Sequence, residues 1–250
     1  MSLQNLRKES GRYGDSFGAG ANRGLGLEFV RQYAADGWEV KAAARDPKSS
    51  KELKQLAAQH KNISLHKLDV AKDESVEELA DELDGTPIDL LIHNAGIYTR
   101  GGQTVGEIDY QGWRDAMETN LFGVLRVTEA LSENVLASGR KQIAAISSSM
   151  ASLGIVQKAP SLGAAGGTAY QYRSSKSALN MALLVLAKEL AAKNVSVVLV
   201  DPGWVKTDMG GPNAQLTPEQ SISGMRKVLA GNPKDLSGKF FGYDGKERPW

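Results

Sequence analysis

From Gly24 onward, short apolar runs alternate with segments in which apolar positions recur every three to four residues. The short runs have the length of buried strands, and the periodic segments have the spacing of amphipathic helices. This alternation is typical of right-handed βαβ units, which build a parallel sheet covered by helices on both faces. The sequence therefore predicts a single α/β domain with a doubly wound parallel sheet.

The expected elements follow from this alternation. Strands are predicted over the apolar runs 38–44, 63–68, 88–92, 142–146, 195–200 and 239–241. Helices are predicted over the amphipathic segments 24–36, 48–60, 73–83, 110–137, 169–192 and 218–230. A stretch rich in Gly, Ala and Ser, 147–168, is expected to be a loop. Residues 151–171, which include Gly154, Gly163, Gly166 and Gly167, should wall a pocket.

The composition is that of a globular domain with its own core. Of the 250 residues, 41% are hydrophobic and 24% are charged, which is close to the average for soluble domains. Lys and Arg number 30 and Asp and Glu number 29, so the net charge is +1. This balance argues against nucleic acid or an anionic membrane as a partner.

The residue types also restrict the chemistry and the location. The chain has no cysteine, which excludes disulfides, thiolate metal sites and cysteine nucleophiles. The three histidines, His60, His66 and His93, lack the spacing of metal ligands, so no metal site is predicted. Residues 1–20 contain no apolar signal-peptide core, and no apolar run approaches the ~20 residues of a membrane span. We therefore expect a cytoplasmic protein.

A glycine-rich turn precedes the first predicted helix. Gly20, Gly24 and Gly26 lie in the run Gly20-Ala-Asn-Arg-Gly-Leu-Gly26, which leads directly into the helix. Such a turn lets backbone N–H groups and a helix N-terminus approach a pyrophosphate. Glycine clusters also occur in ordinary turns, so this spacing alone is a weak signal.

Tyr172 and Lys176 lie four residues apart in a predicted helix and therefore share one of its faces. Reduction of a carbonyl needs a proton for the developing alkoxide, and a tyrosine with its ordinary pKa near ~10 is too weak an acid without help. A lysine ammonium beside the phenol lowers the phenol pKa by stabilising the phenolate. Tyr170 lacks such a partner, because Ser174 lies four residues on. Taken alone, such a pair is more often a structural feature of a helix surface.

Two further groups of candidate residues follow predicted strands. Asn94-Ala-Gly96 follows one strand, where the glycine lets the backbone turn toward a ligand. Ser147, Ser148 and Ser149 follow the next one. A serine in that place is otherwise a turn residue that bonds to the backbone.

The glycine turn, Asn94-Ala-Gly96, Tyr172-x-x-x-Lys176 and Pro202-Gly203 occur in an order that resembles the short-chain dehydrogenase/reductase family. Within that family, residues 201–213 and 243–250 are similar to the C-factor and sniffer-type carbonyl reductase branch. The resemblance covers residues 20–250. It implies one Rossmann-like domain that transfers a hydride between a nicotinamide cofactor and a small carbonyl or alcohol substrate.

The resemblance also implies roles for individual residues. Ser148 would bond the substrate oxygen, Tyr172 and Lys176 would transfer the proton, and Asn120 would hold water in a relay toward the lysine. Ser147 and Ser149 are rivals of Ser148 if the register differs by one, and a structural hydrogen bond is the alternative for Asn120. His93 is assigned to structure. The cofactor-binding positions are Gly20, Asn22, Arg23, Gly24, Leu25, Gly26, Arg45, Asp69, Val70, Asn94, Ala95, Gly96, Tyr172, Lys176, Pro202, Gly203, Val205 and Thr207.

The choice of cofactor depends on the end of the second strand. An acidic residue there binds the ribose 2′-OH of NAD, whereas an arginine nearby accommodates the 2′-phosphate of NADP. By the family register Ala44 takes the acidic position, with Arg45 beside it and Arg23 in the glycine turn, so NADP(H) is predicted. Asp46 keeps NAD(H) open if the register slips by two. Asp69 is either an adenine contact or a helix cap.

Residues 1–19 fall outside the resemblance and form an atypical N-terminal segment. A central strand should precede the glycine turn, but residues 12–19 contain two glycines and an aspartate. Ala19 also stands where family members usually carry threonine. Two explanations stay open, an altered or misread N-terminus and a genuine variant whose first strand is short or missing. Either one predicts a weakened cofactor site.

The sequence therefore predicts an NADP-preferring oxidoreductase, and it does not identify the substrate. The alternative is a cofactor-impaired relative that acts as a binding or signalling protein. A methyltransferase is a third interpretation, but it leaves Tyr172 and Lys176 unexplained.

The helix predicted over 169–192 is apolar around most of its circumference. Because family members pair this helix across a two-fold axis, we expect a homodimer.

Overall fold

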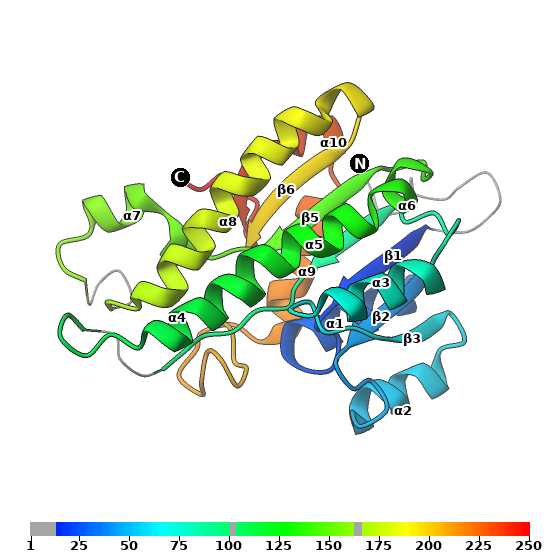
Figure 1. Ribbon diagram of the computed structural model, residues 1–250, viewed down its shortest axis with the longest axis horizontal. Coiled ribbons are helices and arrows are strands. Elements are labelled where there is room, and N and C mark those ends of the chain that lie inside the picture. The colour runs from blue at the N-terminus through cyan, green and yellow to red at the C-terminus, as the bar shows by residue number, and fades with distance from the viewer. Residues whose placement is uncertain (1–13, 101–103, 163–166) are drawn as a thin grey trace.

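The computed structural model describes residues 14–100, 104–162 and 167–250. Its strands are β1 Asp15–Ala19, β2 Glu39–Ala44, β3 Ile63–Lys67, β4 Leu90–His93, β5 Gln142–Ile146, β6 Ser196–Asp201 and β7 Lys239–Gly242. Within the described residues, these seven strands form one parallel sheet in the order β3-β2-β1-β4-β5-β6-β7 (Figure 1). The order reverses between β1 and β4, where doubly wound folds open a crevice at the carboxyl ends of the strands.

Helices cover both faces of the sheet. In the described part of the chain they are α1 Gly24–Ala35, α2 Lys51–Gln59, α3 Asp73–Glu82, α4 Tyr110–Met117, α5 Gly123–Ala130, α6 Ser132–Leu136, α7 Leu153–Lys158, α8 Tyr170–Glu189, α9 Pro218–Leu229 and α10 Pro233–Leu236. One apolar core contains side chains of α3, α5 and α8, such as Val127 and Leu183. The other contains side chains of α1, α2 and α9, such as Phe29 and Met225. The expected doubly wound α/β domain is confirmed. None of these helices, within the described ranges, is long and apolar enough to cross a membrane.

The first strand is present and short. Ser16 and Phe17 are almost completely buried, and β1 pairs with β2 on one side and β4 on the other. The hydrogen bonds to both neighbouring strands use backbone N–H and C=O groups, which do not depend on the type of side chain. They therefore stabilise β1 although its apolar content is low. A Cβ atom on Gly18 would meet nothing within 4 Å. Of the alternatives that the sequence left open, a short strand and a missing one, the structure has the short strand. The sheet thus begins before residue 20, while Arg12 and Tyr13 lie outside the described residues.

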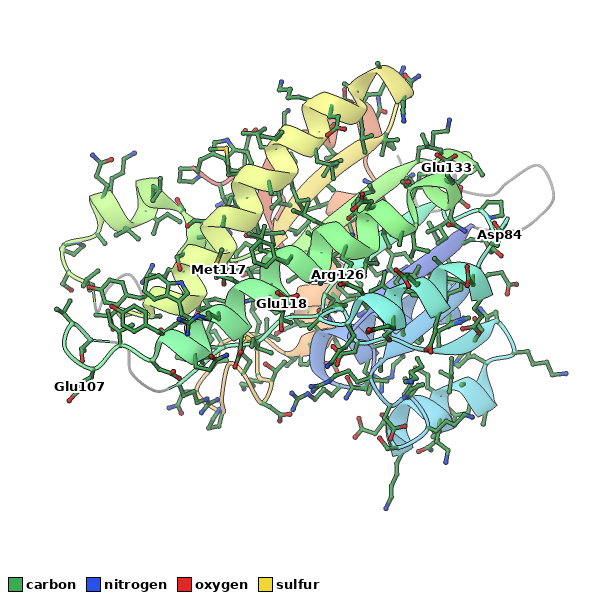
Figure 2. All side chains as sticks on the ribbon, viewed as in Figure 1. Asp84, Glu107, Met117, Glu118, Arg126 and Glu133 are labelled. Atoms are coloured by element: carbon green, nitrogen blue, oxygen red, sulfur yellow. The ribbon has the colours of Figure 1, made fainter. Side chains whose placement is uncertain are left out.

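The sequence predicts one helix over 110–137, but the structure divides it. A π-helical turn, Glu118–Phe122, separates α4 from α5, and α6 follows. The turn contains Asn120, whose side chain bonds to the backbone of Ile97 outside the helix. Arg126 of α5 reaches back across the turn to Glu118, with Nη2 and Oε1 2.9 Å apart (Figure 2). Turns of this kind are frequent at functional sites.

The predicted loop 147–168 is also partly helical. Its described part contains a 3₁₀ turn, Ser149–Ala151, and helix α7. The Ser148 hydroxyl accepts a hydrogen bond from the N–H of Met150 at 3.1 Å, and the Ser152 hydroxyl accepts one from Ile155 at 3.0 Å. Serine side chains therefore cap both short elements. Gly163 and Gly166 lie outside the described residues.

Candidate active site

A cleft of about 520 Å³ lies at the carboxyl edge of the sheet, a volume typical of small-molecule sites. It brings together most of the residues that the sequence predicts for the site. Those that line it are Gly20, Asn22, Arg23, Gly24, Leu25, Arg45, Asp69, Val70, Asn94, Ala95, Gly96, Tyr172, Lys176, Pro202 and Thr207. Gly26, Asn120, Ser148, Gly203 and Val205 are predicted site residues that do not line it.

The glycine turn is built for close backbone approach. Gly20 has φ +75°, and a Cβ atom there would lie 3.0 Å from the backbone of Ala95. A Cβ atom on Gly26 would overlap the carbonyl oxygen of Gly20, so Gly26 supports the turn from outside the cleft. No side chain caps the N-terminus of α1, which follows the turn. Free N–H groups at a helix N-terminus suit a phosphate, so the residues present fit the pyrophosphate of a dinucleotide.

Two arginines, one in the glycine turn and one directly after β2, lie at the cleft. Arg23 and Arg45 both line the cleft. Arg23 Nη1 lies 2.8 Å from a carboxylate oxygen of Asp208, in an exposed ion pair. Asp46 does not line the cleft; its carboxylate accepts a hydrogen bond from the N–H of Ser49 at 3.1 Å and closes a turn.

The residues after β3 and β4 combine lining and structural roles. Asp69 lines the cleft, but its carboxylate also accepts a hydrogen bond from the N–H of Ala71 at 3.1 Å. Asn94 Nδ2 donates to the carbonyl of Gly20 at 3.1 Å and so ties the end of β4 to the glycine turn. A Cβ atom on Gly96 would lie 3.2 Å from Asn120 Oδ1 and 3.5 Å from Lys176 Nζ. Glycine at this position therefore leaves room beside the lysine.

Tyr172 is nearly buried and hydrogen-bonds to the side chain of Ser148. Burial raises the pKa of Tyr172 to about 12, the hydrogen bond with Ser148 opposes this, and the charge of Asp201 adds to it. The Tyr98 ring packs beside it, with the ring centres 5.1 Å apart. Of the three adjacent serines, Ser148 is the one that meets Tyr172, since the Ser147 hydroxyl donates to Asn180 Oδ1 at 2.5 Å. The N–H of Ser149 bonds to Asp201.

Lys176 lies in the interior, one helical turn after Tyr172. Its Nζ donates a hydrogen bond to the carbonyl of Ile146 at 2.8 Å. Burial lowers the pKa of Lys176 to about 8. The net shift of the Tyr172 pKa is upward, because burial of the phenol dominates, and the effect of Lys176 on the phenolate stays a prediction.

The side chain of Asn120 forms hydrogen bonds that hold neighbouring parts of the chain together. Its Oδ1 accepts from the N–H of Ile97 at 2.8 Å, and its Nδ2 donates to the Ile97 carbonyl at 3.0 Å and to Ser175 Oγ at 2.9 Å. These bonds correspond to the alternative that the sequence left open for this residue. Asn120 thereby holds the chain that follows Gly96 against helix α8.

The turn after β6 contains residues that line the cleft and residues that serve packing. Pro202 and Thr207 line the cleft. Gly203 has φ +74°, and a Cβ atom there would lie 2.7 Å from Leu216, so this glycine serves packing. Val205 is buried and forms an isolated bridge with Leu216.

Sequence reasoning missed several lining residues of this cleft: Leu68, Ile97, Thr119, Ile146, Asp208 and Met209. Ala44, which the family register named, and Ser147, the rival of Ser148, line it as well. The ion pair of Asp208 with Arg23 joins residues 185 positions apart, so it cannot be predicted from a local sequence pattern. Arg100 Nη2 adds a hydrogen bond to the Asp208 carbonyl at 2.7 Å. The segment after β6 is therefore tied to the glycine turn.

His93 is buried at the end of β4. Its Nε2 lies 2.9 Å from the Thr128 hydroxyl, which also donates to the carbonyl of Val124 at 2.8 Å. Burial lowers the pKa of His93 to about 3, and the charge of Lys176 adds to the effect. The ring is therefore neutral at ordinary pH.

Comparison with known proteins agrees with this geometry. A family model described as short chain dehydrogenase matches residues 18–216. The C-signal of Myxococcus xanthus is 38% identical over 164 residues, which cover 66% of this chain and 93% of that protein. The carbonyl reductase Sniffer of D. melanogaster has a TM-score of 0.86 at 27% identity, covering 95% of this chain and 99% of that one. An NADPH-bound carbonyl reductase from chicken fatty liver has a TM-score of 0.85 at 32% identity, covering 94% and 98%.

Proposed function

We propose that this chain, which belongs to the short-chain dehydrogenase family, is an NADP-dependent oxidoreductase that interconverts a carbonyl compound and an alcohol. Membership of the family confirms the resemblance found in the sequence. The proposal depends chiefly on one observation: Tyr172, which lines the cleft together with Lys176, forms a hydrogen bond with Ser148 directly behind the lining. A hydroxyl pair beside a cationic side chain is suited to moving a proton to or from a substrate oxygen.

In the reductive direction, the Ser148 hydroxyl donates a hydrogen bond to the substrate carbonyl oxygen. Tyr172 delivers its proton to the same oxygen as negative charge develops on it. A nicotinamide cofactor, when bound in the cleft, supplies the hydride. Lys176 stabilises the phenolate left on Tyr172, because its ammonium form predominates below its pKa of about 8.

The preference for NADP over NAD rests on the two arginines. Arg23 and Arg45 line the cleft, and β2 ends in Ala44, where an NAD-binding fold has an acidic residue. Asp46, the acidic residue nearest in sequence, is engaged in its own turn. Two guanidinium groups without a neighbouring ribose-binding carboxylate favour a 2′-phosphate.

The homodimer is part of the proposal. Helix α8 exposes Met181 and Val185, with 63% and 57% of their surface accessible, on a ridge beside the half-buried Ala182. Near its N-terminal end, a hollow of about 460 Å³ is lined by Tyr110, Trp113, Arg114, Met117, Glu118 and Phe122. Apolar surface of this kind favours burial against a second copy. Light scattering tests this: a monomeric mass at micromolar concentration would contradict it.

The activity is tested by following NADPH absorbance with a panel of aldehydes, ketones and quinones. Turnover with NADPH exceeding that with NADH supports the proposal. NADPH binding without turnover of any compound, or neither binding nor turnover, favours the binding or signalling alternative. The cytoplasmic location predicted from the sequence is a separate part of the proposal, tested by cell fractionation.

A further inference from the structure

The segment that follows β7 folds back over the turn that carries Ser148. The N–H of Arg248 donates to the carbonyl of Phe240 at 2.7 Å, and Trp250 packs its ring against that of Phe240 with 5.9 Å between ring centres. The main-chain oxygen of Trp250 then accepts hydrogen bonds from the N–H of Gly154 at 2.8 Å and the hydroxyl of Ser152 at 3.2 Å. Residues 248–250 therefore contact the chain four to six positions beyond Ser148.

Asp201 joins the same segment to the near side of the turn. This carboxylate at the end of β6 is 4% exposed. Its Oδ1 accepts a hydrogen bond from the N–H of Gly203 at 3.3 Å, and the N–H of Ser149 also faces it and lowers its pKa. Arg248 Nε lies 3.6 Å from its second oxygen. Burial raises the pKa of Asp201, while the two N–H groups and Arg248 lower it. These donors oppose the effect of burial, which is the larger and leaves the pKa of Asp201 above its ordinary value.

The position of Arg248 is itself determined by its surroundings. Its guanidinium lies across the backbone of Gly242, where any Cβ atom would overlap it. A second carboxylate, that of Asp244, lies 3.0 Å from Arg248 Nη2. Two carboxylates thus hold the arginine over a strand residue that has no side chain.

We propose that Asp201 and Arg248 are positioning residues for catalysis: Arg248 holds the Asp201 carboxylate, which holds the N–H of Ser149 and thereby fixes the Ser148 hydroxyl against Tyr172. This inference rests on the proposed function and extends it to residues that do not touch the cleft. The carboxylate also acts on Tyr172 through its charge. The other groups that act on Tyr172 are Ser148 and Tyr98, and Lys176 lines the same cleft. The charges that act on Asp201 are Arg248 and Asp244.

The first test needs no turnover. Amide hydrogen exchange is measured over residues 147–154 in the wild type, Asp201→Asn, Gly242→Ala and the control Glu247→Gln. Gly242→Ala displaces the Arg248 side chain and leaves the Asp201 carboxylate in the chain, and Glu247→Gln removes an exposed carboxylate of the same segment. We expect faster exchange in the first two variants and wild-type exchange in the control. Unchanged exchange in both Asp201→Asn and Gly242→Ala overturns the proposal, whether or not the protein reduces carbonyls.

The second test is kinetic. Asp201→Asn and Arg248→Met should lower kcat about 10- to 100-fold, the loss expected for one hydrogen bond to a charged group. The NADPH Kd should stay within about twofold of wild type, and Arg248→Lys should restore part of the loss. Removing the carboxylate also removes a charge that raises the Tyr172 pKa, so in Asp201→Asn the fall of kcat at high pH should begin at lower pH. A lower kcat with an unmoved pH profile would indicate general destabilisation and contradict the proposal.

Discussion

The side chain of Asn120 holds the backbone of Ile97 by two hydrogen bonds, accepting from its N–H at 2.8 Å and donating to its carbonyl at 3.0 Å. A third bond, from Nδ2 to Ser175 at 2.9 Å, joins this clamp to α8. The chain beyond Gly96 and the helix that carries Tyr172 are therefore fixed relative to each other by one amide. The π-helical turn is what places that amide between them.

Asn120→Ala should destabilise the protein by about 2–4 kcal/mol, because it leaves the N–H and carbonyl of Ile97 without their buried partner. Urea unfolding measures this loss. Gln111→Ala on the exposed face of α4 is the matched control and should change the free energy of unfolding by less than about 0.5 kcal/mol. Equal stability of wild type and Asn120→Ala would show that the clamp contributes nothing.

Tyr172→Phe should lower kcat/KM by about 10²- to 10⁴-fold, since it removes the proton donor and little else. Tyr170→Phe, two residues earlier and exposed, should retain wild-type activity. NADPH binding, measured by fluorescence, should be similar in both variants. Retained turnover in Tyr172→Phe would exclude the proposed role of this residue.

Arg45→Ala should raise the Kd for NADPH about tenfold and leave the Kd for NADH nearly unchanged, because only NADPH carries the 2′-phosphate. Lys48→Ala, an exposed neighbour that does not line the cleft, is the control. Isothermal titration with both cofactors measures the difference. An equal loss for NADPH and NADH would place Arg45 away from the phosphate.

Gly26→Ala should abolish measurable cofactor binding, since its Cβ atom would overlap the carbonyl of Gly20 and distort the turn. Gly18→Ala makes the same chemical change in β1, where a Cβ atom meets nothing within 4 Å. It should preserve binding and stability. Comparable cofactor affinity in the two variants would contradict the role assigned to the turn.

His93 should make the protein less stable in acid. Its pKa falls from 6.5 to about 3 on folding, so below the unfolded value the unfolded chain binds more protons and stability is lost as pH falls toward the folded value. Between about pH 7 and about pH 5 the loss from this group is about 2 kcal/mol. His93→Asn should remove that part of the decline in urea-unfolding free energy. An unchanged slope in the variant would mean that His93 is not a buried neutral base.

Much of the molecule could be predicted from local sequence. The spacing of apolar residues indicates the α/β class. A helix that buries one face needs an apolar residue every three to four positions, and a strand that is buried on both faces needs a short continuous apolar run. The glycine turn and the Tyr172–Lys176 pair are also local, since the residues of each motif lie within seven positions of one another. The resemblance to the family then selects Ser148 among three adjacent serines, and the structure places that serine beside Tyr172.

The tertiary structure decided what depends on distant partners. Whether Asp15–Ala19 forms a central strand depends on the ladders offered by β2 and β4, not on its own apolar content. The π-helical turn forms where Asn120 meets Ile97, and the burial that raises the pKa of Tyr172 is supplied by elements packed around α8. The meeting of Asp201 with Arg248 likewise joins residues separated by a strand and two helices. Local pattern determines which elements form, whereas contacts between distant residues determine their exact limits and the charges at the site.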